Sequence, residues 1–244
     1  MTDVIRCPWI TKDPVYLRYH DEEWGTPNRD GRRLFEKIIL EGAQAGLSWI
    51  TILKRRENYR AAFDGFDPVK IAAYDEDDVK RLMGDAGIIR NQAKIRSAIN
   101  NAKVFVEHFG DDEDAFSEFL WDFVDGNPII NQRNSTDDSP PVTEISKKMG
   151  KELKKMGFSF IGPTTCYAMM QSAGMVDDHY VACFRHTSNR EVAFSTSIRV
   201  SASILEMTSE HQDTNWHGTE HRKEERRIII MPEHCYHPES CNGR

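Results

Sequence analysis

The stretch KKMGFSFIGPTTCYAMM, residues 154–170, decides the fold that we predict for this chain. A basic helix leads into a short hairpin, and Gly162 then opens a second helix. The N-terminal amides of that second helix, where Thr164 lies, form a site for an anion such as a phosphate. Lys154 and Lys155 precede this site. They favour a contact with a DNA backbone, although lysines in such a row also occur on solvated helix faces.

The rest of the chain up to about residue 186 shows many helix signals and few strand signals. Asp13-Pro14 and Asp67-Pro68 each place an N-cap before a proline at the first helical position. Amphipathic periodicity predicts further helices over residues 31–44, 49–63, 75–83, 90–109, 112–124, 142–156 and 177–184. We therefore predict an all-α domain over residues 1–186 and a flexible extension over residues 187–244, where the sequence becomes polar and aperiodic.

Composition sets only broad limits. The 244 residues are 39% hydrophobic and 29% charged, as in ordinary globular proteins. We find neither a long apolar run nor a signal-peptide pattern, so we expect a cytoplasmic protein with no membrane contact, or a nuclear one in a eukaryote. Five cysteines in a reducing compartment are expected to be free or metal-bound. The net charge of −7 argues weakly against a nucleic-acid partner.

Two cysteines and two histidines form a candidate metal site. Cys7 and His20 lie thirteen residues apart, and His179 and Cys183 lie four apart on one face of the predicted helix over residues 177–184. Together they would make a complete Cys2His2 shell, which suits tetrahedral Zn²⁺ in a closed, structural site. The alternative is that the histidines are ordinary polar residues and the cysteines fill the core.

The end of the chain holds a second group of possible metal ligands, His234, Cys235, His237 and Cys241. A disordered appendage is the simpler interpretation of that segment.

Glu41 is unusual because it continues the apolar stripe of Leu34 and Ile38 near a helix C-terminus. There the apolar side chains desolvate the carboxylate and the helix dipole repels it. One interpretation is a rim residue that reaches water. The other is a buried carboxylate for a cationic or amino-bearing ligand. Five aromatic residues, which are either core or a cage for a flat, electron-poor ring, favour the second: Trp9, Tyr16, Tyr19, Trp24 and Trp49.

These residues resemble a known family, the type I 3-methyladenine DNA glycosylases of the constitutive bacterial (Tag) kind. The resemblance covers about residues 6–185 and rests on long collinear motifs: RCPW, DPVYLRYHDEEWG, LEGAQAGLSWITILKRRENYRAAF, FDPVKIA, DAGIIRNQAKI and GFSFIGPTTCYAMMQSAGMVDDH. It implies the all-α, two-lobed fold of the helix-hairpin-helix glycosylases. It also implies one structural zinc ion on Cys7, His20, His179 and Cys183.

The same resemblance implies the substrate and the roles of individual residues. The substrate would be 3-methyladenine in alkylated double-stranded DNA, flipped out of the stack and excised to start base excision repair. Glu41 matches the carboxylate that contacts the base, and Trp49 matches the ring on which the base stacks. Leu47 is the candidate wedge that enters the duplex. The remaining aromatics would form the surrounding wall: Trp9, Tyr16 and Trp24, with Tyr19 near it.

Two positions depart from the pattern of the wider superfamily. The hairpin lacks its first glycine because Phe160 stands there, so we expect its backbone to hold a phosphate less tightly. Asp177 occupies the position of the superfamily's catalytic aspartate, but the type I family is not thought to need an acid there. Asp177 is therefore either catalytic or the N-cap of the helix over residues 177–184.

Two other classes of protein remain open at this point. One is a zinc-stabilised DNA-binding module without catalysis, which would not need Glu41 in an aromatic cage. The other is a metallohydrolase, which would need an open metal position; the four-ligand shell argues against it. For the glycosylase we expect a monomer with no obligate protein partner, associated with the nucleoid when it is bound to DNA.

Overall fold

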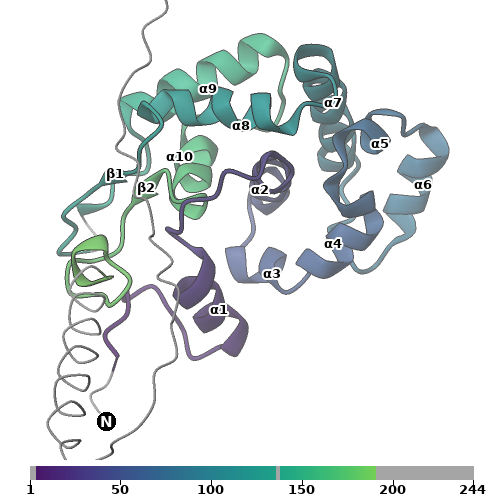
Figure 1. The fold of residues 1–244 in the computed structure, drawn as a ribbon. Helices are drawn as coiled ribbons and strands as arrows, with labels where there is room; N and C mark the ends of the chain where they lie inside the picture. The colour runs from purple at the N-terminus through teal and green to yellow at the C-terminus, as the bar shows by residue number, and fades with distance from the viewer. Residues whose placement is uncertain (1–3, 136–137, 191–244) are drawn as a thin grey trace, which may run out of the picture. The chain divides into compact units, whose positions relative to one another are not determined.

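The computed structural model describes residues 4–135 and 138–190, and every structural statement below concerns this part of the chain (Figure 1). The described residues belong to one compact unit. The extension predicted from residue 187 lies outside the described residues after Arg190. The possible metal ligands near the end of the chain lie outside them altogether.

The described residues fold mainly into helices. In chain order the elements are α1 (Pro14–Arg18), a π-helical turn (Tyr19–Glu23), α2 (Gly31–Gln44), α3 (Trp49–Leu53), α4 (Arg56–Ala62), a 3₁₀ turn (Asp64–Phe66), α5 (Pro68–Ala72), α6 (Glu76–Gly84), α7 (Gln92–Phe109), α8 (Glu113–Trp121), a second 3₁₀ turn (Asp122–Val124), β1 (Ile129–Ile130), α9 (Glu144–Met156), α10 (Pro163–Ser172) and β2 (Val176–Asp177). No helix among these residues is both long and apolar enough to cross a lipid bilayer.

Side-chain caps explain where most of these helices begin. Each cap is a short polar side chain that accepts a hydrogen bond from an amide of the first turn, and such a cap contributes about 1 kcal/mol. The caps are Asp13 for α1, Asp30 for α2, Asp67 for α5, Asp75 for α6, Asn91 for α7, Asp112 for α8 and Thr143 for α9. The helix starts predicted at Asp13-Pro14 and Asp67-Pro68 are confirmed.

Helix α2 is the centre of the fold. It contacts α3, α7, α8 and α10, and nearly all of its residues are buried, including Leu34, Ile38 and Glu41 (Figure 1). The main hydrophobic core forms around it. Because Glu41 lies in the last turns of this helix, the fold carries a carboxyl group into the interior.

A second, smaller hydrophobic cluster lies apart from the main core. Its buried members are Cys7, Tyr19, Trp24, Leu53 and Cys183, and Trp49 belongs to both groups. Because it contains both Cys7 and Cys183, this second cluster joins the start of the chain to the end of the described domain.

Three local predictions differ from the structure. First, residues 177–184 form no helix. The segment begins with β2, which pairs in parallel with β1, and Tyr180 then forms an isolated bridge with Arg133. Pairing with a distant strand therefore outweighs the helical pattern of the segment. His179 and Cys183 come together through a turn, in which the amide of Cys183 donates to the carbonyl of Tyr180 at 2.7 Å.

Second, the two short strands themselves were not predicted. Third, the single helix expected over residues 49–63 is divided into α3 and α4. The amide of Arg55 donates to the carbonyl of Ile52, which tightens the chain there, and the Arg55 guanidinium reaches the carbonyls of Ala86 and Gly87. This tertiary contact accounts for the break.

The hairpin between α9 and α10 contains Phe160 in a left-handed conformation, with φ of +52°. This is a conformation that glycine adopts without strain and that costs other residues about 1–2 kcal/mol. Asn101 of α7 offsets that cost by holding the neighbouring backbone: it accepts from the amide of Ser159 at 2.8 Å and donates to its carbonyl at 3.1 Å. The missing glycine therefore changes the residue but leaves the turn intact.

Candidate functional site

A cavity of about 290 Å³ lies between the N-terminal segment, α2, α3 and the segment from α10 to Tyr180. Its lining residues are Trp9, Tyr16, Tyr19, Trp24, Glu41, Gln44, Trp49, Ser139, Ala168, Gln171, Asp178 and Tyr180. The structure thus brings together Glu41 and all five aromatic residues singled out in the sequence.

The aromatic side of the cavity is continuous. The ring of Trp9 lies 5.3 Å from that of Tyr16 and 4.9 Å from that of Trp24, measured between ring centres. Tyr19 lies 6.4 Å from Tyr16 and 5.7 Å from Trp49. Rings at these separations pack against one another and hold their faces in place. They form a rigid wall suited to a flat ligand.

Glu41 is only 6% exposed, and burial raises the pKa of its carboxyl group to about 8. Lys37, one turn earlier on α2, opposes this shift by its positive charge. Lys37 is itself buried, and its Nζ atom lies 3.4 Å from Oε1 of Glu23, which also pairs with Arg56 at 2.7 Å. The carboxyl group is therefore poised to change its charge when a cation enters the cavity.

Another part of the cavity lining was not predicted from the sequence. Asp178 is buried there, and its Oδ1 accepts from Asn131 at 2.7 Å and from Arg133 at 2.9 Å. Its Oδ2 accepts from Tyr167 at 2.5 Å and from Gln171 at 2.7 Å. Burial opposes ionisation of Asp178, but these hydrogen bonds outweigh it and hold its pKa below the ordinary value. Glu41 and Asp178 thus give the cavity two carboxyl groups with opposite pKa shifts.

Asp177 is not among the residues that line the cavity. Its Oδ1 accepts from the amide of His179 at 3.1 Å, and its Oδ2 accepts from the amide of Thr187 at 2.8 Å and lies 3.3 Å from Arg190. No helix begins at Asp177, so the alternative of a helix N-cap at this position is wrong. Its contacts fix the turn around His179 and bring residues 187–190 onto the domain.

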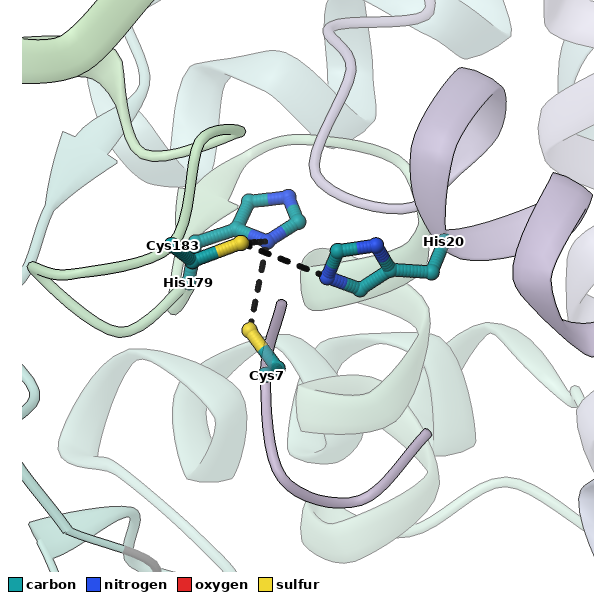
Figure 2. A group of neighbouring side chains, drawn as sticks. All are labelled: Cys7, His20, His179 and Cys183. Carbon is teal, nitrogen blue, oxygen red and sulfur yellow. Dashed lines mark hydrogen bonds between the residues drawn. The ribbon is translucent and has the colours of Figure 1, made fainter. Parts of the chain in front are cut away.

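The four predicted metal ligands converge in the interior (Figure 2). Their ligand atoms all lie within 4.8 Å of one another, and all four residues are buried. Sγ of Cys7 lies 3.4 Å from Nδ1 of His179; Sγ of Cys183 lies 3.5 Å from Nε2 of His20 and 3.6 Å from Nδ1 of His179. The cluster could hold a metal ion.

Neighbouring groups turn each imidazole toward the centre of this cluster. Nδ1 of His20 lies 2.8 Å from a carboxylate oxygen of Asp21, which Arg6 holds in turn at 2.7 Å. Nε2 of His179 lies 3.0 Å from the carbonyl of Trp24. Acceptors at these outer nitrogens leave the inner ones, Nε2 of His20 and Nδ1 of His179, as ligands. The pKa of the Cys183 thiol is lowered, first by a hydrogen bond from Cys7 and then by the two histidines, so it favours the thiolate that metals bind.

The metal cluster supports the aromatic wall of the cavity. The ring of Trp24 lies 4.6 Å from that of His179 and the ring of Trp9 lies 5.4 Å from that of His20. Cys7 and Cys183 belong to the same hydrophobic cluster as these rings. Any ion held there acts on the cavity through this packing.

Leu47 lies outside the cavity, on the turn that follows α2, and is 38% exposed. The amide of Leu47 donates to the carbonyl of Gln44 at 2.7 Å, and Gly46 has a φ of +79°, which makes the turn tight. Nζ of Lys94 donates to the carbonyls of Ala43 at 2.8 Å and Ala45 at 2.6 Å. An exposed apolar side chain is thus presented on a braced turn.

The predicted anion site lies at the start of α10. Gly162 is the N-cap residue, and no side chain caps this helix. Thr164 in its first turn is exposed, as are Lys154 and Lys155 in the last turn of α9. The amides of this turn therefore remain available to an anion.

A helical domain with a buried carboxyl group inside an aromatic cage belongs to the class of proteins that can bind a flat, cationic or amino-bearing ligand. Comparison with known proteins identifies the family. The family model described as methyladenine glycosylase matches residues 9–186. The chain belongs to this family.

Two bacterial relatives match over nearly their whole length. The chain is 50% identical over 185 residues to DNA-3-methyladenine glycosylase 1 of Escherichia coli (strain K12), and the alignment covers 76% of this chain and 98% of that protein. It is 51% identical over 185 residues to DNA-3-methyladenine glycosylase of Haemophilus influenzae, and this alignment covers 75% of this chain and 98% of that protein.

Solved structures agree with the fold. A crystal structure of 3-methyladenine DNA glycosylase I superposes with a TM-score of 0.72 at 52% identity and covers 75% of this chain and 100% of its own. The Staphylococcus aureus enzyme, whose structure is described as the structural basis of 3-methyladenine recognition, gives 0.69 at 39% identity and covers 73% and 94%.

Proposed function

We propose that this protein is a DNA repair glycosylase that flips 3-methyladenine out of alkylated double-stranded DNA and hydrolyses its N-glycosidic bond, starting base excision repair. The observation that carries the proposal is Glu41, a buried carboxyl group on the wall of an aromatic cavity. The relatives named above carry the same activity in their names.

The cavity suits a cationic purine. Methylation at N3 gives the base in DNA a positive charge, and the Glu41 carboxylate stabilises that charge and accepts from the exocyclic amino group. Trp49 provides the face on which the base stacks, and Trp9, Tyr16, Tyr19 and Trp24 enclose it. Burial favours the neutral form of Glu41 while the cavity is empty. A cationic base stabilises the ionised carboxylate by its charge, and an uncharged base does not, so the uncharged base binds less tightly.

The reaction asks little of acid catalysis. The methylated base is already a good leaving group, so the residues of the chain need to expose it, hold it and admit a water to the sugar. Flipping costs a few kcal/mol, and the Leu47 side chain offsets part of this by filling the gap left in the stack. Asp177 acts in this proposal as a positioning residue, because both of its oxygens are engaged away from the cavity.

We infer that DNA binds along the hairpin between α9 and α10, in the manner of helix-hairpin-helix proteins. The amides at Gly162 and Thr164 face one phosphate, with Lys154 and Lys155 close by in the sequence. This contact positions the duplex and gives no sequence specificity, as a repair enzyme requires. We expect the protein to act as a monomer.

We infer further that the metal cluster holds one structural Zn²⁺ per chain. In a tetrahedral site with bonds of about 2.3 Å to sulfur and 2.0–2.1 Å to nitrogen, sulfur and nitrogen lie about 3.5 Å apart. The distances of 3.4–3.6 Å between the sulfurs and the inner nitrogens fit this geometry. Four protein ligands leave no position for a water, so the ion stabilises the fold and takes no part in hydrolysis.

The test is release of free 3-methyladenine from alkylated duplex DNA. We expect release by the wild-type protein and a large loss with Glu41→Gln, while affinity for the DNA, which comes mainly from phosphates, stays nearly unchanged. A protein that binds the duplex and releases no base would instead be the non-catalytic DNA-binding module.

A further inference from the structure

We propose that the exposed ring of Phe160, in the hairpin between α9 and α10, packs against a deoxyribose of the bound DNA and so positions the strand between its phosphate contact and the wedge at Leu47. The inference rests on the proposed function, since it adds a contact to the DNA named there. It is carried by the exposure of the ring, by the strained backbone that presents it and by its place between two parts of the proposed DNA-binding surface.

The hairpin buries one aromatic ring and exposes another. Phe158 is 3% exposed and belongs to the main hydrophobic core, whereas Phe160 is 44% exposed. A single exposed apolar side chain is common on protein surfaces, so exposure alone assigns no role to it. The backbone at this position is the second observation.

The backbone of Phe160 is strained and is held in place by α7. Its φ of +52° lies in a region that disfavours every residue with a side chain. Asn101 bonds both backbone groups of Ser159, and the hydroxyl oxygens of Ser97 and Ser159 lie 2.8 Å apart. Strained positions that their surroundings maintain in this way cluster at functional sites. A glycine would adopt the same turn without strain, so what the strain maintains is the presented ring.

Phe160 lies beside the end of α2 that leads to the wedge. A Cβ atom at Gly42 would be 3.4 Å from Cβ of Phe160, so the hairpin packs directly on the last turn of α2. Phe160 also shares a small cleft with Lys94, whose Nζ atom donates to two carbonyls at the start of the turn that carries Leu47. The exposed ring and the wedge turn are therefore neighbours, although they are far apart in the sequence.

The proposed phosphate contact lies on the other side of Phe160. Gly162, two residues further on, begins α10 without a side-chain cap. In the proposed complex the amides of this helix start hold one phosphate and Leu47 fills the gap in the stack, so the strand between them passes the ring of Phe160. A deoxyribose presents an apolar face, which a ring can cover without reading the base. Such a contact positions the strand whatever the neighbouring sequence, as a repair enzyme requires.

The experiment measures the affinity for a duplex that holds a stable abasic-site analogue, at several salt concentrations, in wild-type protein, Phe160→Asn and Val69→Asn. Asparagine accepts the left-handed conformation, so Phe160→Asn removes the ring and keeps the turn. We expect Kd to rise about threefold to tenfold, the effect of uncovering part of an aromatic ring. Val69→Asn is the matched control: Val69 is 47% exposed on α5, outside the proposed DNA-binding surface, and Kd should not change.

The salt dependence separates a contact with the sugar from a structural role of the ring. Affinity for DNA falls with salt in proportion to the number of phosphates contacted, and an apolar contact leaves that slope unchanged. Plots of log Kd against log salt concentration should therefore be parallel for wild-type protein and Phe160→Asn. A slope smaller by about one unit would overturn the proposal, because the ring would then act by holding the turn against the phosphate.

An unchanged Kd for Phe160→Asn, or a rise no larger than that of Val69→Asn, would also overturn the proposal, since the ring would then contact only the protein. Binding of free 3-methyladenine, followed by quenching of tryptophan fluorescence, should be the same in wild-type protein and Phe160→Asn. Weaker binding of the free base would place Phe160 in base recognition and would count against the proposal as well. Failure of the proposed function is distinct, because the wild-type protein would then release no 3-methyladenine from alkylated DNA, whatever its affinity for the duplex.

Discussion

Replacing Glu41 with Gln turns a carboxyl group of the cavity into an amide. It removes a group whose ionisation is unfavourable in the folded protein. Burial raises the pKa of Glu41 from its ordinary value of 4.5 to about 8. Between these values the folded protein binds a proton that the unfolded chain has released, so stability falls as the pH rises through this window. From pH 5 to pH 8 the loss amounts to about 3 kcal/mol by linkage.

Glu41→Gln carries no titrating group and does not suffer this loss. We therefore expect the mutant to gain stability relative to the wild-type protein as the pH rises, by about 3 kcal/mol between pH 5 and pH 8. Urea unfolding of both proteins at several pH values measures the difference. Titrating groups that do not interact with Glu41 are shared by the two proteins and cancel, which leaves the Glu41 carboxyl group and its partner Lys37 as the source of the difference.

The same substitution should weaken binding of the cationic base. A hydrogen bond to a charged group contributes about 1.5–3 kcal/mol, which corresponds to roughly tenfold to a hundredfold in Kd. The mutant is thus expected to be more stable at pH 8 and less able to bind. A stability difference that stays constant from pH 5 to pH 8 would refute the reasoning, because Glu41 would then titrate as an exposed carboxyl group does.

Three further substitutions test other parts of the site. Cys183→Ala should lose the metal, measured by elemental analysis against about one equivalent in the wild-type protein, and should lower the melting temperature; an unchanged melting temperature in metal-free protein would contradict a structural ion. Asp177→Asn should keep single-turnover excision within about tenfold of wild type, whereas loss of an electrostatic catalyst costs about 10² to 10³ in rate. Leu47→Ala should slow excision from duplex DNA and leave binding of the free base unchanged; an equal loss in both assays would place Leu47 in base recognition.

The sequence was sufficient where a signal is local. Residues 31–44 form a helix with Leu34 and Ile38 facing the interior, as their spacing predicts. The spacing left Glu41 open between the rim and the interior, and the structure shows it buried. The aromatic residues of the N-terminal segment line one cavity with Glu41, as the cage interpretation requires.

The part of the cavity lining around Asp178 could not be predicted, because it depends on pairing between distant segments. β1 and β2 are two residues long, too short for a periodic pattern, yet their pairing brings Asn131 and Arg133 onto Asp178. The same pairing places Tyr180 on the cavity. The one signal in the sequence was the pair Asp177-Asp178, and it does not say which of the two faces the cavity.

The metal cluster shows why a correct set of residues can follow from an incorrect local structure. His179 and Cys183 were placed on a helix because their spacing of four suits one, whereas a turn held by Asp177 and Tyr180 brings them together. That turn belongs to the segment that carries Asp178 and Tyr180 into the cavity. Closure of the cluster by Cys7 and His20 also fixes Trp9 and Trp24 against the imidazoles. An ion bound by this cluster would not touch the base, yet it would hold in place both the aromatic wall and the segment that carries Asp178 and Tyr180. We therefore expect its removal to act on recognition through geometry.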